Sequence, residues 1–197
     1  MNQLMRELGD ESWHEAWQAD SAEEPLLTVD LNGVTFVWVY GDRPEDPIDG
    51  GLVFDVQFYL GDHIQLKEAR LSDLQVEAGD MLSLVLVWQA DDYPEHDSEV
   101  FSHLLSPDDD LVAQQDNIPL HGIRPTSTWR PDEELEDLYR IQIDPAVQPG
   151  TYTLSGGMYD QIMLQRIPAF NKSGDRLSED RIIIADIAVV PATYTDR

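Results

Sequence analysis

Short apolar runs, each ending at glycine, proline or aspartate, recur along most of this chain. In the clearest run, residues 52–60, side chains of two kinds alternate without a break over nine positions. A period of two is typical of a β-strand with one buried face. The pattern therefore predicts a strand whose inward set is Leu52, Phe54, Val56, Phe58 and Leu60.

A β-hairpin is predicted just before this strand. Residues 26–31 and 34–40 are rich in apolar residues, and Asn32-Gly33 joins them. Asparagine and glycine tolerate the positive φ that a two-residue type I′ turn requires. We therefore expect these two runs to pair as antiparallel strands.

Similar runs follow at short intervals and predict an all-β fold. They cover residues 63–71, 81–89, 100–105, 111–116, 138–143, 151–160 and 181–190, for about nine or ten strands in all. In the run 81–89, the expected inward set is Leu82, Leu84, Leu86 and Trp88. No alternation of strands with helices is present, so we expect a single antiparallel β-sandwich, jelly-roll-like or immunoglobulin-like.

Helical spacing is confined to the first 20 residues. Leu4, Met5 and Leu8 share one side, and Trp13, Ala16 and Trp17 continue the apolar stripe. Spacings of three and four residues predict a short helical segment that covers an edge of the sheet, with a functional tryptophan pair as the alternative. The predicted organisation is a helical segment or linker at 1–25, a β-sandwich domain at 26–191 and a tail at 192–197.

The charge of the chain limits its partners. There are 39 Asp and Glu residues against 12 Lys and Arg, for a net charge of −27, and no cysteine. Such a surface repels phosphate backbones and anionic lipids, so we expect neither nucleic acid nor direct membrane insertion. The absence of cysteine excludes disulfides, thiolate nucleophiles and cysteine zinc sites. Residues 1–18 lack the apolar core of a signal peptide, and no run reaches the ~20 apolar residues of a membrane helix.

A set of motifs spread over residues 25–190 forms a recognisable series. The motifs are Leu31-Asn32-Gly33-Val34 with Phe36 and Trp38-Val39-Tyr40; Gly79-Asp80 before Leu84–Ala90; Val100-Phe101 with His103-Leu104-Leu105; Leu111–Gln114 with Asp116; Pro125-Thr126 with Trp129, Pro131 and Glu133; Pro149–Tyr152; and Gly157–Asp160. Together they resemble a domain at the C-terminus of multi-span bacterial membrane glycosyltransferases of the protein-mannosyltransferase or lipid-linked-sugar class, known mainly from Chloroflexi-type genomes.

The resemblance implies an accessory sandwich rather than an enzyme. The catalytic acids of those glycosyltransferases lie in a membrane portion that this chain lacks. If the chain is part of a larger protein, the resemblance implies a place on the extracytoplasmic side of the membrane. We therefore expect a non-catalytic accessory or interaction module of the cell-envelope glycan machinery, with a glycan or an envelope protein as partner. No feature of the sequence sets an oligomeric state.

The alternative is a carbohydrate-binding module, and a hydrolase is a third class. The chain has no Gly-x-Ser-x-Gly elbow, Walker loop, dinucleotide fingerprint or His-Glu-x-x-His motif. With 39 carboxylates, acid pairs at glycosidase-like separations are unavoidable and carry little information. His103 alternates with Phe101 and Leu105, so we expect a core-facing or interface histidine rather than a zinc ligand.

Tyr93, Trp129 and Tyr159 are the candidate ligand-binding residues, because they lie in or beside predicted loops. An exposed aromatic ring can stack on the apolar face of a sugar. For Trp129 the alternative is a packing role.

Asp42, Asp46 and Asp49 are the candidate metal ligands, and Asp91–Asp97 forms a second acidic loop. Calcium takes six to eight oxygen ligands, and neither loop follows the EF-hand pattern. We therefore expect solvated loop charge at both loops and no cofactor, with calcium binding as the alternative.

The excess of acids predicts a salt-dependent stability. At a net charge of −27 the folded state repels itself, and added salt screens this repulsion, because the Debye length falls from about 10 Å at 0.1 M to about 3 Å at 1 M. We expect the thermal midpoint, followed by circular dichroism, to rise as NaCl increases. A flat or falling midpoint would show that the acids are already neutralised in the fold.

Overall fold

A computed structural model describes residues 27–31, 34–39, 48 and 51–192. The chain divides into two compact units, Met1–Asp46 and Pro47–Arg197. In the first unit, β1 (Leu27–Leu31) pairs antiparallel with β2 (Val34–Val39), as predicted. The Asn32-Gly33 turn, the predicted helix and the tail from residue 193 lie outside the described residues. The hairpin belongs to the first unit, whereas the sequence analysis assigned it to the sandwich domain. An alternating pattern predicts that a segment is a strand, but it does not show which sheet the strand joins.

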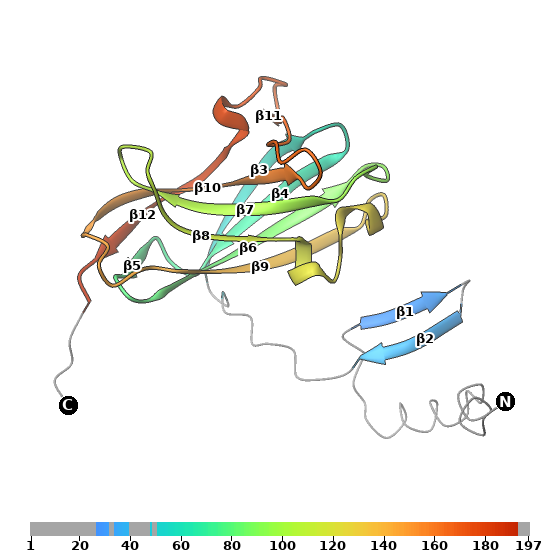
Figure 1. The fold of residues 1–197 in the computed structure, drawn as a ribbon, viewed down its shortest axis with the longest axis horizontal. Coiled ribbons are helices and arrows are strands. Elements are labelled where there is room, and N and C mark those ends of the chain that lie inside the picture. Colours follow the sequence, from blue (N-terminus) through green and yellow to red (C-terminus); the bar gives the residue numbers. More distant parts are fainter. Residues whose placement is uncertain (1–26, 32–33, 40–47, 49–50, 193–197) are drawn as a thin grey trace. The chain divides into compact units, whose positions relative to one another are not determined.

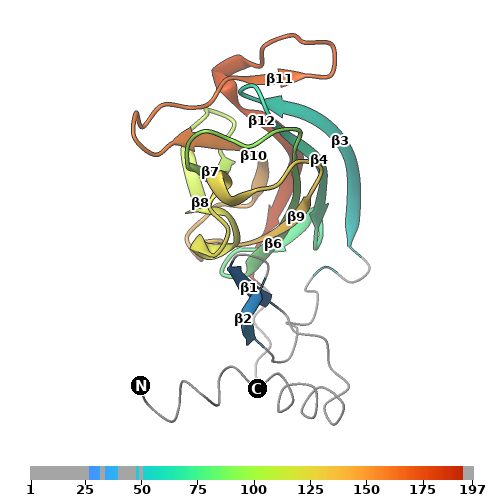
Figure 2. The same cartoon turned by 90° about the vertical axis from the view of Figure 1, so that its right-hand side faces the viewer.

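The second unit is a sandwich of two five-stranded sheets (Figure 1). One sheet has the order β5-β12-β10-β7-β8 and is here called the first sheet; the second sheet has the order β11-β3-β4-β6-β9. All pairings are antiparallel except β5 with β12. Figure 2 shows the two sheets on opposite sides of the unit. The all-β sandwich prediction is therefore confirmed. The strands are β3 (Leu52–Leu60), β4 (Ile64–Leu71), β5 (Gln75–Glu77), β6 (Met81–Ala90), β7 (Ser98–Leu105), β8 (Leu111–Asn117), β9 (Glu134–Gln142), β10 (Gly150–Asp160), β11 (Ala169–Asn171) and β12 (Ile182–Val190).

Three strand predictions differ from the structure. β5 and β11 were not predicted, because three residues are too few to show a period. β9 begins at Glu134, before the predicted start at residue 138, because the acids of its first half hide the alternation. In that half Leu135 and Asp137 point inward, and Asp137 is a buried acid that no apolar pattern predicts.

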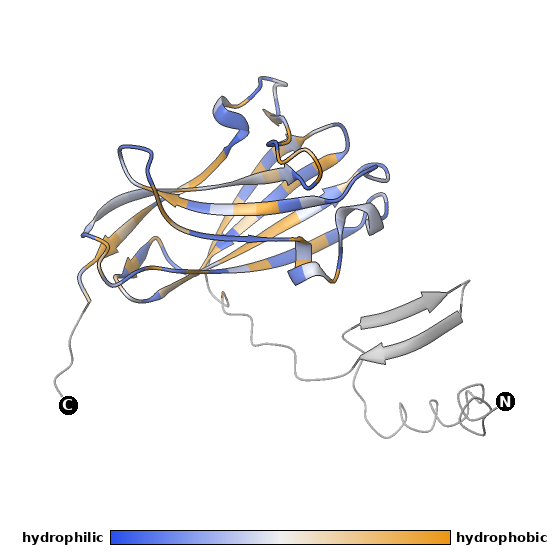
Figure 3. Ribbon diagram, viewed as in Figure 1, coloured by the Kyte–Doolittle hydropathy of each residue, from blue (hydrophilic) through white to orange (hydrophobic). Residues whose placement is uncertain are grey.

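The core lies between the two sheets and is built from the inward sets. Both predicted inward sets are confirmed with one exception: Leu52 is 41% exposed at the start of β3, where the sheet ends. Figure 3 shows the alternation of apolar and polar residues along the strands. The largest fully buried side chains are Trp88, Trp129, Tyr139, Phe101, Leu60, Leu66, Leu71, Leu82, Leu84, Leu86, Leu104 and Ile141.

Leu84 tests the assignment of the inward face. Its side chain is fully buried on β6, whereas Met81 on the same strand is 48% exposed. We expect Leu84→Ala to lower the free energy of unfolding by about 2–5 kcal/mol, because it leaves a cavity. Met81→Ala is the matched control and should change it by about 0.5 kcal/mol or less. Urea unfolding of both variants measures the difference, and equal losses would contradict the assignment.

Candidate functional site

The outer face of the first sheet carries an aromatic and basic layer. Phe101 points away from the core yet is fully buried. The guanidinium of Arg166 lies over it, 4.9 Å from the ring centroid, and 5.8 Å from the ring centroid of Tyr159. The two aromatic rings are 4.9 Å apart. Beneath Phe101, a Cβ at Gly157 would lie 2.5 Å from the ring, so glycine is required for this close approach.

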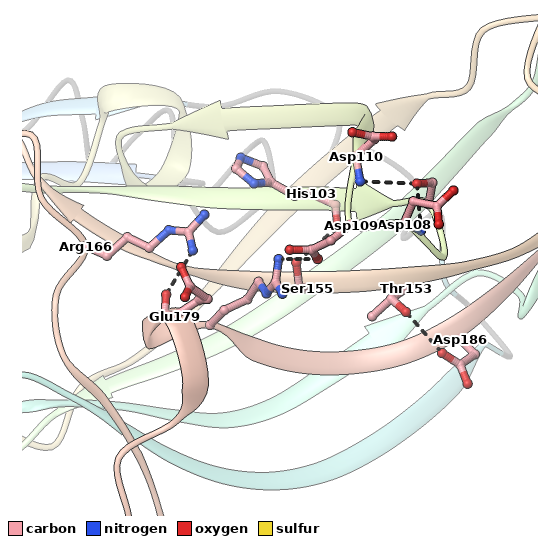
Figure 4. Close-up of polar contacts among 11 residues, drawn as sticks. His103, Asp108, Asp109, Asp110, Thr153, Ser155, Arg166, Glu179 and Asp186 are labelled. Atoms are coloured by element: carbon pink, nitrogen blue, oxygen red, sulfur yellow. Dashed lines mark hydrogen bonds and ion pairs between the residues drawn. The ribbon is translucent and has the colours of Figure 1, made fainter.

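A second arginine spans the same face. Arg181, just before β12, forms an ion pair of 2.8 Å with Asp109 in the β7–β8 turn. Arg181 lies at β12 and Asp109 between β7 and β8, and β10 separates β12 from β7 in the sheet order. The ion pair therefore crosses the outer face. Figure 4 shows the polar residues around it. Two arginines thus cover much of the face.

His103 is buried on the same outer face, with its ring centroid 4.7 Å from that of Phe101, and is not a core residue. It was expected to face the core or an interface, but its inward neighbours in β7 are Val100 and Leu104. Its Nε2 lies 3.2 Å from a carboxylate oxygen of Asp116 on β8. A single carboxylate partner does not make a zinc site, which needs three or four ligands.

Ser155, His103 and Asp116 lie on three neighbouring strands but do not form a catalytic triad. Ser155 pairs with His103 in the β10–β7 register. The serine is fully buried, and its hydroxyl donates to the backbone carbonyl of His103 at 3.4 Å. A nucleophilic serine must instead hydrogen-bond the imidazole and be open to substrate. The arrangement of Ser155, His103 and Asp116 is therefore structural.

A hollow of about 490 Å³ opens beside the aromatic layer. Its lining residues are Gln165, Arg166, Arg176, Leu177, Glu179 and Asp180. Arg176 donates two hydrogen bonds of 2.7 Å to Asp180 and holds the pKa of that carboxyl below its usual range. Arg166 donates to the backbone carbonyl of Glu179 at 2.9 Å (Figure 4). Most of the polar groups here are already bonded to one another, so the hollow offers few free groups to a ligand.

The outer face of the second sheet is open near Tyr59, whereas Val85 and Val87 on the same face are buried in a cluster with Ile48. The strand register places five side chains in one row across β11, β3, β4, β6 and β9. The residues next to them along the strands, such as Leu60 after Tyr59 and Ala169 before Phe170, face the core. We call the outward set the Tyr59 row; it consists of Phe170, Tyr59, Gln65, Gln89 and Glu134.

Tyr59 is 40% exposed and stands at the edge of a small hollow of about 40 Å³. The hollow is lined by Tyr59, Asp62, His63, Ile64, Gln65, Gln89 and Asp91. Asp91 accepts a hydrogen bond of 2.9 Å from His63, and this bond raises the pKa of the imidazole. Gln89 donates to the backbone carbonyl of Asp132 at 3.1 Å, and Lys67 pairs with Glu134. The row thus combines aromatic rings, amides and a carboxylate in an accessible place.

The three predicted ligand-binding residues lie in different environments. Tyr93 is 61% exposed in the β6–β7 loop, and Tyr159 is half-buried in the aromatic layer. Trp129 is fully buried, and its indole N–H donates to the carbonyl of Arg124 at 3.0 Å. A buried indole presents no face to a ligand, so the expectation of stacking at Trp129 is corrected to a packing role.

The sequence pointed to loops and missed the Tyr59 row. A signal was present, because Tyr59 belongs to the outward set of the alternating strand 52–60. What alternation cannot show is which residues of other strands stand beside it. Gln65 and Gln89 become its neighbours through register alone.

The candidate metal ligands Asp42, Asp46 and Asp49 lie outside the described residues. Within residues 51–192, no three histidine, aspartate or glutamate side chains gather as metal ligands, and the acids of the Asp91–Asp97 loop are no exception. In the same part of the chain, no helix has the length and apolar character needed to cross a bilayer.

Asp137 is the buried acid of the second sheet. It is 1% exposed, accepts a hydrogen bond from the hydroxyl of Tyr139 and accepts another of 3.0 Å from the backbone N–H of Leu120. Leu120 and His121 both have positive φ, near 52° and 53°. The carboxylate therefore anchors a strained turn, and burial raises its pKa above the ordinary value.

Comparison with known proteins leaves the family of the chain open. No protein-family model matches it, and no curated protein does. Among solved structures, it is similar to the C-terminal domain of wzt, with 16% identity, a TM-score of 0.44, and coverage of 77% of this chain and 81% of that one. It is also similar to a Niemann-Pick type C2 protein from the Japanese carpenter ant, at 8% identity, a TM-score of 0.40, and coverage of 71% and 99%.

A third similar structure is the CARDB domain of a Pyrococcus furiosus protein in complex with di-metal ions. It shares 11% identity and a TM-score of 0.37, with coverage of 71% of this chain and 98% of that one. At TM-scores below 0.5 these likenesses carry no argument about ligands or metals. The function has to be argued from the chain's own side chains.

The packing role of Trp129 is testable with Tyr93 as the control. We expect Trp129→Ala to lower the free energy of unfolding by about 3–5 kcal/mol, because a buried indole leaves a large cavity. Tyr93→Ala removes an exposed ring and should change stability by about 0.5 kcal/mol or less. Urea unfolding distinguishes them, and a stable Trp129→Ala variant would contradict the packing role.

Asp137 gives a prediction about pH. Because its pKa is raised in the fold, the carboxyl ionises first in the unfolded chain as pH rises. Its contribution to stability is full below about pH 4, the pKa of a free aspartate, and is lost as pH rises through the folded pKa. We expect Asp137→Asn to gain stability relative to the parent chain as pH rises above about 4. Asp137→Leu should lose about 1–3 kcal/mol, since two buried donors lose their partner.

Urea unfolding of the three chains at several pH values measures these differences. The other acids are common to all three chains, so subtraction isolates Asp137. A pH dependence identical in the parent chain and the Asn variant would show that Asp137 does not titrate between its unfolded and folded values.

Proposed function

We propose that this chain is a non-catalytic accessory module that binds a neutral glycan along the Tyr59 row. One observation carries the proposal: the register of five strands aligns two aromatic residues, two amides and a carboxylate on one outer face. The side chains in this row differ in chemistry, and their order is that of an aromatic platform followed by hydrogen-bonding groups.

The row suits an extended sugar chain. Adjacent strands are about 4.8 Å apart, so four intervals span roughly 19 Å. An aromatic ring such as Tyr59 can cover the apolar face of a pyranose. Gln65 and Gln89 each offer both donors and acceptors, which matches hydroxyl groups that do both. The arrangement therefore supports binding of several sugar residues laid across the strands.

The local charge favours a neutral glycan. Asp62 and Asp91 border the row, Glu134 ends it, and the whole chain carries −27. Uronates and phosphosugars would be repelled from such a surface. Neutral hexoses are not repelled, and their hydroxyl groups can donate hydrogen bonds to the carboxylates.

Two acids with shifted pKa values support a role without bond cleavage. Glycoside hydrolysis needs an acid that stays protonated at neutral pH and touches the substrate. Asp180, beside the larger hollow, has a lowered pKa because Arg176 holds it ionised. Asp137 has a raised pKa but lies in the core, 1% exposed. Neither acid combines the two requirements.

Association with cell-envelope glycan machinery rests on the sequence resemblance over residues 25–190. An extracytoplasmic glycan-binding sandwich beside a membrane glycosyltransferase would hold the acceptor or product near the enzyme. Calcium support through Asp42, Asp46 and Asp49 is a separate expectation, and a rise in the thermal midpoint with CaCl₂ but not with MgCl₂ would support it.

Removal of the Tyr59 ring tests the proposal. Binding to a panel of neutral mannose, glucose and galactose oligosaccharides can be followed by isothermal titration calorimetry. For the sugar that binds, we expect Tyr59→Ala to weaken affinity about tenfold or more, equivalent to about 1.4 kcal/mol. Tyr59 is partly exposed, so the thermal midpoint should change little.

Tyr93→Ala is the matched control, since it removes another exposed tyrosine outside the row. It should bind as the parent chain does. A panel in which no neutral sugar binds, or a Tyr59→Ala variant with full affinity, would overturn the site. Turnover of any glycoside or glycosyl donor by the purified chain would overturn the non-catalytic reading.

A further inference from the structure

The turn after β10 displays three consecutive large apolar side chains to solvent. Ile162 is 81% exposed, Met163 67% and Leu164 78%. Figure 3 shows this turn as an apolar loop at the end of β10. We call these three residues the apolar tip. Single exposed apolar residues are common on protein surfaces, but a contiguous group marks an interaction site.

The apolar tip sits on a well-defined turn. The carboxylate of Asp160 accepts hydrogen bonds from the backbone N–H groups of Ile162 and Met163, at 2.8 and 2.7 Å. These bonds lower the pKa of Asp160. The N–H of Leu164 donates to the Asp160 carbonyl at 2.9 Å, and the N–H of Asp160 donates to Gln165 at 2.9 Å. These hydrogen bonds therefore fix the backbone of the turn, from which the three apolar side chains project into solvent.

Nothing in the backbone of this turn requires apolar side chains. The hydrogen bonds of Asp160 go to main-chain groups, which any residue supplies. Leu164 even has a positive φ of 52°, where glycine or asparagine would fit with less strain. The choice of isoleucine, methionine and leucine thus serves something outside the turn.

The β6–β7 loop beside the apolar tip is acidic, and the nearby Arg166 is engaged with Phe101 and the carbonyl of Glu179. Gln161 donates to the carbonyl of Asp97 at 3.3 Å, which places the β6–β7 loop beside the turn. That loop carries Asp91, Asp92, Glu95 and Asp97, together with the exposed ring of Tyr93. A second copy of the chain and an anionic bilayer would both be repelled here. The complementary occupant is a protein with an apolar pocket and a basic rim.

We propose that the apolar tip is the anchor of a protein-docking surface, in which Ile162, Met163 and Leu164 enter an apolar pocket of a partner protein whose rim is rich in lysine and arginine. The acids of the β6–β7 loop face that rim. A small, preorganised anchor loses little conformational freedom on binding, so few residues can carry most of the affinity. This docking does not depend on the Tyr59 row.

Photo-cross-linking in the cells that make the protein tests the proposal. Met163→benzoylphenylalanine places the reactive group in the apolar tip. Leu111→benzoylphenylalanine is the matched control, because Leu111 is 51% exposed beside the opposite end of β7. We expect one discrete protein adduct at position 163 that is absent at position 111. The adduct should disappear when Ile162→Ser and Leu164→Ser are added, and should persist with Tyr59→Ala.

The partner identified in this way is then purified and its affinity measured. We expect the Ile162→Ser, Leu164→Ser chain to bind about tenfold or more weakly than the parent. Association should slow as NaCl rises, and Asp92→Asn with Glu95→Gln should slow it similarly. An adduct with lipid, with a second copy or within the same chain, or no adduct at all, would overturn the proposal. A partner that binds the parent chain and the Ile162→Ser, Leu164→Ser chain with equal affinity would also overturn the proposal.

Discussion

The packing of two sheets through their inward side chains is the constraint on which this molecule depends. In most strands, every second side chain is apolar because it enters the space between the sheets, where Leu84 and Leu104 are fully buried. The same alternation sends the intervening residues outward. Once the antiparallel register is fixed, the outward residues of neighbouring strands form rows that no single strand contains. The candidate binding row exists for that reason.

The two outer faces of the sandwich differ in how far other side chains cover them. On the first sheet, Arg166 lies over Phe101, and the Arg181–Asp109 pair spans the face; Phe101 and His103 are buried there without belonging to the core. The chain has only 12 basic residues, and two of them, Arg166 and Arg181, lie on this face. On the second sheet, Tyr59 remains 40% exposed. The second sheet is open only near the Tyr59 row, since Val85 and Val87 on the same outer face are buried in a cluster with Ile48.

Acidic residues have different roles in this fold, and the surroundings of each carboxylate decide its role. Asp137 is buried and anchors the turn at Leu120, at the cost of a raised pKa. Asp160 accepts main-chain hydrogen bonds and shapes the apolar tip, with a lowered pKa. The acids of the β6–β7 loop are solvated and set the sign of the surface potential. A net charge of −27 therefore describes the exterior but not the roles of individual carboxylates.

The sequence alone determined the all-β architecture, most strand positions and the inward sets, because alternation is a local property that burial of one face imposes. It also established the acidic surface, since charge is a sum over residues. Tertiary structure decided what depends on neighbours from other strands. It buried Trp129, turned His103 outward from the core, and placed Gln65 beside Tyr59. Register and cover arise from packing between distant segments, and a local pattern contains no information about which segments meet.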